Sequence, residues 1–372
     1  MSVMELQPRS LAVSRTARAS VVLVTVLCWL MLSACALAGE AHDIEIEDHR
    51  LHIECSGQGV PTVILDAGLG GTALEWVFVI ERVQALTQIC TYDRAGYGGS
   101  DLGPLPRTSS RIAHELAHLL VRARIAPPYV LVGHSFGGYN MQMFARRYPG
   151  LTAALVLLDA AHPDQVERFA APPLNRVTAP SSRTGIVQFR ELPPPILALP
   201  PLQRQWALER AARWKTRRTV SAELLSFRDS AAEVRAAPPL GGLPLVVISR
   251  GRSDEEATPK RVLFEQIWLE LQTDLAANSS ASAHLLARNS GHHIQLEQPD
   301  LVAFAIGLVV ARTRGPAAMS HWAETLAVRT TDGEYRLRGA TWLKDDLSLY
   351  PLPALAATPC PRARASTASG AP

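Results

Sequence analysis

Short apolar runs of β-favouring residues alternate with longer helical patterns through the middle of the chain. The strand-like runs are Asp43–Glu47, Leu51–Cys55, Thr62–Asp66, Gln88–Asp93, Tyr129–His134, Ala154–Asp159, Pro244–Ser249 and Ala283–Arg288. The helical patterns are Leu74–Leu86, Ser110–Arg124, Phe136–Tyr148, Arg261–Ala277 and Leu301–Arg312. Strand and helix repeated this often predict an α/β fold, a mostly parallel eight-stranded sheet with helices on both faces.

The alternation stops between residues 161 and 243, a stretch rich in proline and arginine. Helical patterns occur there at Leu202–Arg217 and Ser221–Ala236. Long segments without strands are unusual inside a compact domain, and lids are a common reason for them. We therefore predict an inserted helical cap over the end of the sheet.

Three segments make up the predicted domain organisation. Residues 1–38 are a signal peptide, residues 39–312 are the α/β domain with its cap, and residues 313–372 are a C-terminal extension. Within the extension, Leu326–Arg338 carries an Asp-Gly pair between alternating residues and predicts a small hairpin. The stretch from Pro351 is rich in Pro, Ala, Ser and Thr, a composition typical of disorder.

The N-terminus has the pattern of an export signal. Three arginines within residues 9–18 precede the apolar run Val21–Leu32, and small residues follow. The run is shorter than the roughly 20 residues that span a bilayer, so an uncleaved anchor is the weaker reading. Two cleavage sites compete: Ala36-Leu37-Ala38 fits an ordinary signal peptidase, and Leu32-Ser33-Ala34-Cys35 resembles a bacterial lipobox. The protein is predicted to be periplasmic or secreted, or a lipoprotein attached to a membrane through Cys35.

Charge and cysteine usage exclude several classes of partner. The net charge is only +3, and no basic stripe with interleaved aromatics indicates nucleic-acid binding. The five cysteines contain no C-x-x-C pair, so a zinc or redox motif is unsupported. Two lie in the signal and one in the tail, which leaves Cys55 and Cys90 for the fold. In an oxidising compartment these two could form a disulfide, and two buried free thiols are the alternative.

The segment Gly133-His134-Ser135-Phe136-Gly137 is the strongest chemical signal in the chain. It follows an apolar strand and opens a helix, and its glycines permit a sharp strand-to-helix turn that exposes the serine hydroxyl. The helix N-terminus favours developing negative charge. This pattern predicts Ser135 as a nucleophile.

A serine hydroxyl needs a base to take its proton. The segment Ser290-Gly291-His292-His293 follows the last predicted strand and supplies two histidines, of which His292 is the predicted base and His293 its rival. For the acid that orients the base we favour Asp254, in the loop after Pro244–Ser249, because it lies between the serine and the histidine. Asp159, at the end of the preceding strand, is the alternative.

The negative oxygen of a tetrahedral intermediate needs two preorganised N–H donors. One is predicted to be the backbone of Phe136, directly after the nucleophile. The other is predicted to be Leu69, in the glycine-rich loop Ala67-Gly68-Leu69-Gly70-Gly71 after a strand. This loop lacks the lysine of a phosphate-binding P-loop.

From about residue 45 to residue 312 the chain resembles the α/β-hydrolase superfamily. The matching segments are Asp66–Gly71, Asp93–Ser100, Gly133–Gly138 and Ser290–Pro299. In order they look like the oxyanion loop, a structural turn after the fourth strand, the nucleophile elbow and the histidine loop. Ala67 replaces the histidine that usually begins the first of these. The resemblance implies that the second and fourth strands are antiparallel neighbours, which favours the Cys55–Cys90 disulfide.

The resemblance also implies hydrolysis through an acyl-enzyme, without a metal or organic cofactor. A serine at position 135 argues against haloalkane dehalogenases and epoxide hydrolases, which use an aspartate there. We expect a small-molecule carboxylic ester as substrate, with thioester, amide or carbon–carbon hydrolysis and cofactor-free perhydrolysis as alternatives. Leu197, Leu202, Trp206 and Trp76 favour a moderately apolar substrate, unless they only pack. A surface lipoprotein that keeps the fold as a non-catalytic scaffold is the alternative of another class.

Overall fold

The computed structural model describes residues 40–172, 174, 194–253, 255–315, 327–329 and 335–337. The predicted signal with Cys35, the predicted acid Asp254 and the tail from Pro351 lie outside the described residues. None of the helices within those ranges is long and apolar enough to cross a membrane.

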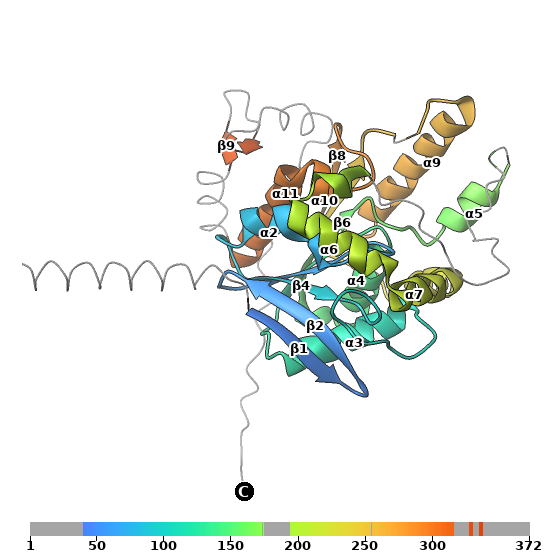
Figure 1. Ribbon diagram of the computed structural model, residues 1–372. Helices are drawn as coiled ribbons and strands as arrows, with labels where there is room; N and C mark the ends of the chain where they lie inside the picture. Colours follow the sequence, from blue (N-terminus) through green and yellow to red (C-terminus); the bar gives the residue numbers. More distant parts are fainter. Residues whose placement is uncertain are drawn as a thin grey trace, which may run out of the picture. The chain divides into compact units, whose positions relative to one another are not determined.

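Eight strands form one sheet in the order β1-β2-β4-β3-β5-β6-β7-β8 (Figure 1). β2 runs antiparallel to β4. The neighbouring strands β4, β3, β5, β6, β7 and β8 all run parallel to one another. The predicted mostly parallel sheet, with antiparallel second and fourth strands, is therefore confirmed. The bounds are β1 (Glu40–Ile46), β2 (His49–Ser56), β3 (Thr62–Asp66), β4 (Ile89–Asp93), β5 (Tyr129–His134), β6 (Thr152–Leu158), β7 (Leu245–Arg250) and β8 (Ser282–Ala287).

Helices cover both faces of the sheet because the central strands are apolar on both sides. In β3, Val63 and Leu65 pack in one core cluster with α2 and α11, while Ile64 packs in the opposite cluster with α3, α4 and α9. The helices are α2 (Val77–Val83), α3 (Ser109–Arg122), α4 (Phe136–Arg147), α9 (Pro259–Ala276) and α11 (Pro299–Arg314). Short helical turns are η1 (Ala73–Trp76), η2 (Pro149–Leu151) and α10 (Ile294–Glu297).

The insertion after β6 is helical, as predicted, but its helices divide differently. It contains α5 (Gln165–Ala170), η3 (Pro194–Ala198), α6 (Pro201–Ala212), α7 (Trp214–Leu225) and α8 (Phe227–Ala236). The helical pattern at Leu202–Arg217 spans nearly all of α6 and the start of α7, because Arg213 is extended (ψ 139°) and separates them. Ser226 (φ −88°, ψ 3°) likewise separates α7 from α8. α8 packs against α3 and α4, which fixes the cap to the core domain.

A disulfide joins Cys55 of β2 to Cys90 of β4. The two residues lie directly opposite each other in the antiparallel register, with Cα atoms 4.1 Å apart. The bond therefore crosslinks the antiparallel edge of the sheet to its parallel part.

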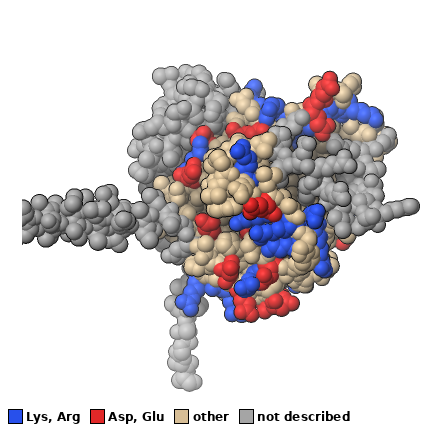
Figure 2. Space-filling model, in the orientation of Figure 1, with Lys and Arg blue, Asp and Glu red and all other residues tan. Residues whose placement is uncertain are grey.

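The remaining features lie at the surface and the C-terminal end. Basic and acidic side chains are interspersed over the face shown in Figure 2, in keeping with a formal net charge of only +3. Within the predicted hairpin Leu326–Arg338, β9 (Ala327–Arg329) and β10 (Tyr335–Leu337) pair antiparallel.

Candidate active site

Ser135 occupies a strained turn between β5 and α4, with φ 51° and ψ −119°. Glycines flank it because backbone lies too close for a side chain. A Cβ at Gly133 would lie 2.6 Å from the carbonyl oxygen of Gly137, and one at Gly137 would lie 2.4 Å from that of Asp66. The Ser135 N–H donates to the carbonyl oxygen of Leu158 (3.1 Å). Strain held by such surroundings is typical of functional residues.

The glycine-rich loop after β3 passes beside the nucleophile. A Cβ added to Gly68 would lie 3.0 Å from His134 Nδ1 and 3.2 Å from the Cβ of Ser135, so a larger residue here would crowd the elbow. Leu69 follows in the same loop. Phe136 is the first residue of α4, where backbone N–H groups have no partner within the helix. Phe136 is therefore next to Ser135 in the chain, and Leu69 follows the glycine that lies beside it.

The carboxylate that meets His292 is that of Asp159. His292 Nδ1 lies 2.6 Å from Asp159 Oδ2, and Asp159 follows β6 in a fully buried position with φ 40°. The structure thus brings the alternative acid to the predicted base, while the favoured Asp254 lies outside the described residues. The rival base His293 lies with its ring 5.3 Å from that of His134.

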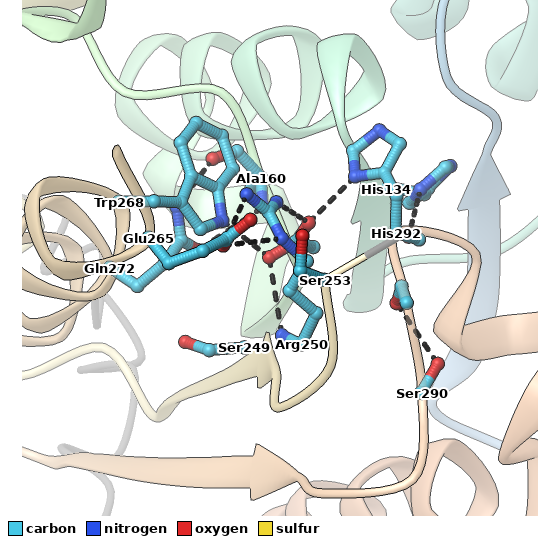
Figure 3. A network of polar contacts seen from close by, with 12 residues as sticks. His134, Ala160, Ser249, Arg250, Ser253, Glu265, Trp268, Gln272, Ser290 and His292 are labelled. Atoms are coloured by element: carbon cyan, nitrogen blue, oxygen red, sulfur yellow. Dashed lines mark hydrogen bonds and ion pairs between the residues drawn. The ribbon is translucent and has the colours of Figure 1, made fainter. Parts of the chain in front are cut away.

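Two further side chains hold the Asp159 carboxylate, and sequence reasoning missed both. Arg250 Nη1 donates to Oδ2 (2.5 Å) and Trp268 Nε1 donates to Oδ1 (2.6 Å). Figure 3 shows Arg250, Trp268 and His292 converging from different elements. Burial alone would raise the pKa of Asp159, but the Arg250 charge and the hydrogen bonds from His292 and Trp268 outweigh it and hold that pKa well below its ordinary value. The carboxylate is therefore ionised and fixed in orientation.

A second buried cluster links the elbow to the histidine loop. The His134 Nε2–H donates to the carbonyl oxygen of His292 (2.8 Å), so Nδ1 accepts from the Gln295 side chain (3.1 Å). The same Gln295 amide donates to Glu75 Oε2 (3.1 Å), on η1 after the oxyanion loop. Burial lowers the pKa of His134 far below its ordinary value, so its ring is neutral. These contacts fix the backbone that carries His292.

Glu75 in this cluster should make stability depend on pH. Burial raises its pKa to about 7, from an ordinary 4.5. Between these values the folded state binds more protons than the unfolded chain, so the stabilisation present in acid is lost as pH rises to 7. A glutamine at position 75 cannot ionise. As the pH rises through this range, the free energy of unfolding of the wild type should therefore fall by on the order of 3 kcal/mol relative to that of Glu75→Gln. Urea unfolding of both chains at pH 5, 6, 7 and 8 measures the difference. If the free energy of unfolding depended on pH in the same way in both chains, the prediction would be contradicted.

A third buried network ties the oxyanion loop to the cap. Arg94, in the turn after β4, donates through Nη1 to Asp66 Oδ1 and the Ala67 carbonyl (both 2.6 Å) and through Nη2 to the Gly68 carbonyl (2.9 Å). Its Nε donates to Glu223 Oε1 of cap helix α7 (2.9 Å). The carbonyl groups of residues 67 and 68 are thus directed at Arg94. The segment predicted to be structural, Asp93–Ser100, therefore supplies Arg94, which fixes the conformation of the oxyanion loop.

The four apolar residues behind the expectation of a moderately apolar substrate lie in two kinds of surroundings. Trp76 is fully buried in the core cluster with α2 and α11. Leu197, Leu202 and Trp206 are all exposed cap residues. A cavity of about 20 Å³ instead lies between the loop after β3 and the cap. Its lining consists of Gly70, Gly71, Thr72, Leu74, Glu75, Ile196, Leu199, Ala207 and Ala211.

The fold and this site define a hydrolase. The sequence profile of the Alpha/beta hydrolase family matches residues 63–306, and the chain therefore belongs to that family. Uncharacterized protein YqjL of Bacillus subtilis (strain 168) is 27% identical over 252 residues, which are 67% of this chain and 83% of that protein. A putative carbamate hydrolase RutD of Azorhizobium caulinodans is 30% identical over 168 residues, 44% of this chain and 59% of RutD.

The chain is also similar in fold to solved structures of the family. A haloalkane dehalogenase, the DbeA-M1 loop variant from Bradyrhizobium elkanii, aligns with a TM-score of 0.55 at 15% identity. The alignment covers 76% of this chain and 100% of the dehalogenase chain. At this identity the likeness concerns the fold alone.

Proposed function

We propose that the protein is a serine hydrolase that cleaves carboxylic esters through an acyl-enzyme. Ser135 is the nucleophile, His292 the general base and Asp159 the acid that orients it. The observation that carries the proposal is the 2.6 Å contact between His292 Nδ1 and the buried Asp159 carboxylate. The ring of this histidine lies 4.7 Å from that of His134, the residue directly before the nucleophile.

The proposed reaction assigns each step to a group of this chain. The Ser135 hydroxyl attacks the ester carbonyl and gives its proton to Nε2 of His292, because Nδ1 is engaged with Asp159. The ionised Asp159 stabilises the imidazolium, and the N–H groups of Phe136 and Leu69 receive the oxyanion. His292 then protonates the leaving alcohol. Water, activated by the same histidine, hydrolyses the acyl-enzyme and restores Ser135.

The site of action belongs to the same proposal: the protein works outside the cytoplasm. Residues 1–38 carry the pattern of an export signal. The Cys55–Cys90 disulfide supports the proposal independently, because disulfides persist in oxidising compartments and are rare in the cytosol.

A fluorophosphonate probe tests the nucleophile. We expect the purified chain to be labelled once, at Ser135, and Ser135→Ala and heat-unfolded protein to remain unlabelled, because only the folded site activates the hydroxyl. Peptide mass mapping identifies the labelled residue. An unlabelled wild type would reject the serine hydrolase and favour a binding scaffold.

Nitrophenyl esters of graded acyl length test the substrate class on the same preparation. We expect turnover, with the dependence on chain length mapping the acyl site. Labelling at Ser135 without turnover of any ester would reject ester hydrolysis. Carbamates are then the next substrates to assay, since RutD is described as a putative carbamate hydrolase.

A further inference from the structure

Two histidines and a glutamate meet on the surface of the core domain, apart from the residues of the candidate active site. His114 and His118 lie one turn apart on α3 and so share a face of the helix. Glu47, in the turn between β1 and β2, faces both. Its Oε1 is 3.1 Å from His114 Nε2 and 3.7 Å from His118 Nδ1. One ligand atom from each of the three residues lies within 4.8 Å of the others.

These distances are close to those around a tetrahedral metal ion. Zinc binds imidazole nitrogen and carboxylate oxygen at about 2.0–2.1 Å, which places two ligand atoms about 3.3 Å apart. The two Glu47–histidine distances, 3.1 and 3.7 Å, lie on either side of that value. The second oxygen of Glu47 lies 3.8 Å from Arg111 Nη1, which leaves Oε1 directed at the histidines.

We propose that Glu47, His114 and His118 form a zinc-binding site that crosslinks the β1–β2 turn to α3, with water as the fourth ligand. All three side chains are partly exposed (34%, 31% and 47%), so an ion can reach them from solvent. Imidazole and carboxylate together suit zinc among the common divalent ions. No other residue needs to move into the site.

The segment His114-Glu115-Leu116-Ala117-His118 also has the H-E-x-x-H spacing in which metalloproteases use the glutamate as general base. Here that role is closed to Glu115. Its side chain is 2% exposed, and Arg107 Nη1 and Nη2 donate to its two oxygens at 2.6 and 2.8 Å. The proposed site therefore binds metal without supplying a base for metal-assisted hydrolysis.

Calorimetric titration of the purified, untagged, chelator-treated chain with Zn²⁺ tests the site. We expect His118→Ala and Glu47→Gln each to weaken zinc binding by at least about tenfold, because even outer-shell partners of a metal site contribute that much. His52→Ala is the matched control, since His52 pairs with Asp43 at the surface (2.7 Å) but belongs to no described three-residue group. It should bind zinc like the wild type.

Cobalt provides a second readout that does not depend on activity. Co²⁺ at the site should give the visible absorption of a four-coordinate ion in the wild type and in His52→Ala, and lose it in His118→Ala. Circular dichroism of the metal-free variants verifies that each is folded. Equal zinc affinity in the wild type, His118→Ala and Glu47→Gln, or no saturable zinc binding by the wild type, would overturn the proposal.

Discussion

Replacing Asp159 with asparagine is expected to lower kcat/KM for ester hydrolysis by about 10⁴-fold, the loss seen when a triad aspartate becomes an amide. The reason lies in the 2.6 Å contact between His292 Nδ1 and Asp159 Oδ2. An asparagine can present its N–H₂ group to His292, which favours the wrong tautomer and removes the charge that stabilises the imidazolium. Initial rates on the best nitrophenyl ester give kcat and KM separately, and the loss should fall mainly on kcat.

The matched control is Asp254→Asn, which removes the other candidate acid and should leave kcat/KM close to that of the wild type. Asp159→Asn also takes a partner from Arg250, so circular dichroism and thermal unfolding must show that the variant is folded. A large loss in Asp254→Asn with little loss in Asp159→Asn would reverse the assignment of the acid.

The choice between these two acids shows where sequence reasoning stops. The sequence predicts Asp254 because it lies just beyond the strand Pro244–Ser249 and between Ser135 and His292 in the chain, but Asp159 satisfies the same order. Asp159 directly follows β6, the strand next to β5, and the carboxyl ends of neighbouring parallel strands lie side by side. The elbow at the end of β5 is therefore adjacent to Asp159. That proximity needs the strand order, which a single sequence does not contain.

Local patterns were sufficient for the sheet and the elbow because their signals lie within a few residues. The buried networks depend on contacts between distant segments. Arg94 and Glu223 are 129 residues apart, and Glu75 and Gln295 are 220 apart. A charged or amide side chain in isolation is most often a solvated surface residue, so nothing in the sequence distinguished these four. The position of the break between α6 and α7 at Arg213 likewise has no sequence signal, since no proline or glycine marks it.

Arg94→Met should have the largest effect on stability, a loss of about 3–5 kcal/mol in the free energy of unfolding. The side chains of Arg94, Asp66 and Glu223 are at most 1% exposed, so removing the cation leaves two buried carboxylates without their charged partner. For a domain of this size the change corresponds to a fall in Tm of about 6–20 °C. Urea unfolding and thermal unfolding measure it. Arg168→Met is the control, because Arg168 and its partner Glu270 are 40% and 62% exposed, and an exposed pair contributes less than about 1 kcal/mol.

A double variant separates loss of charge pairing from loss of packing. Adding Glu223→Leu to Arg94→Met removes one of the uncompensated carboxylates, so the double variant should recover part of the stability lost in Arg94→Met. Arg94→Met should also lower activity, and the double variant should not recover it, because the carbonyl groups of Ala67 and Gly68 would still lack the guanidinium that orients the oxyanion loop. A double variant that loses the sum of the two single effects would show that Arg94 and Glu223 act independently. An Arg94→Met chain as stable as Arg168→Met would show that the buried network does not hold the cap to the loop.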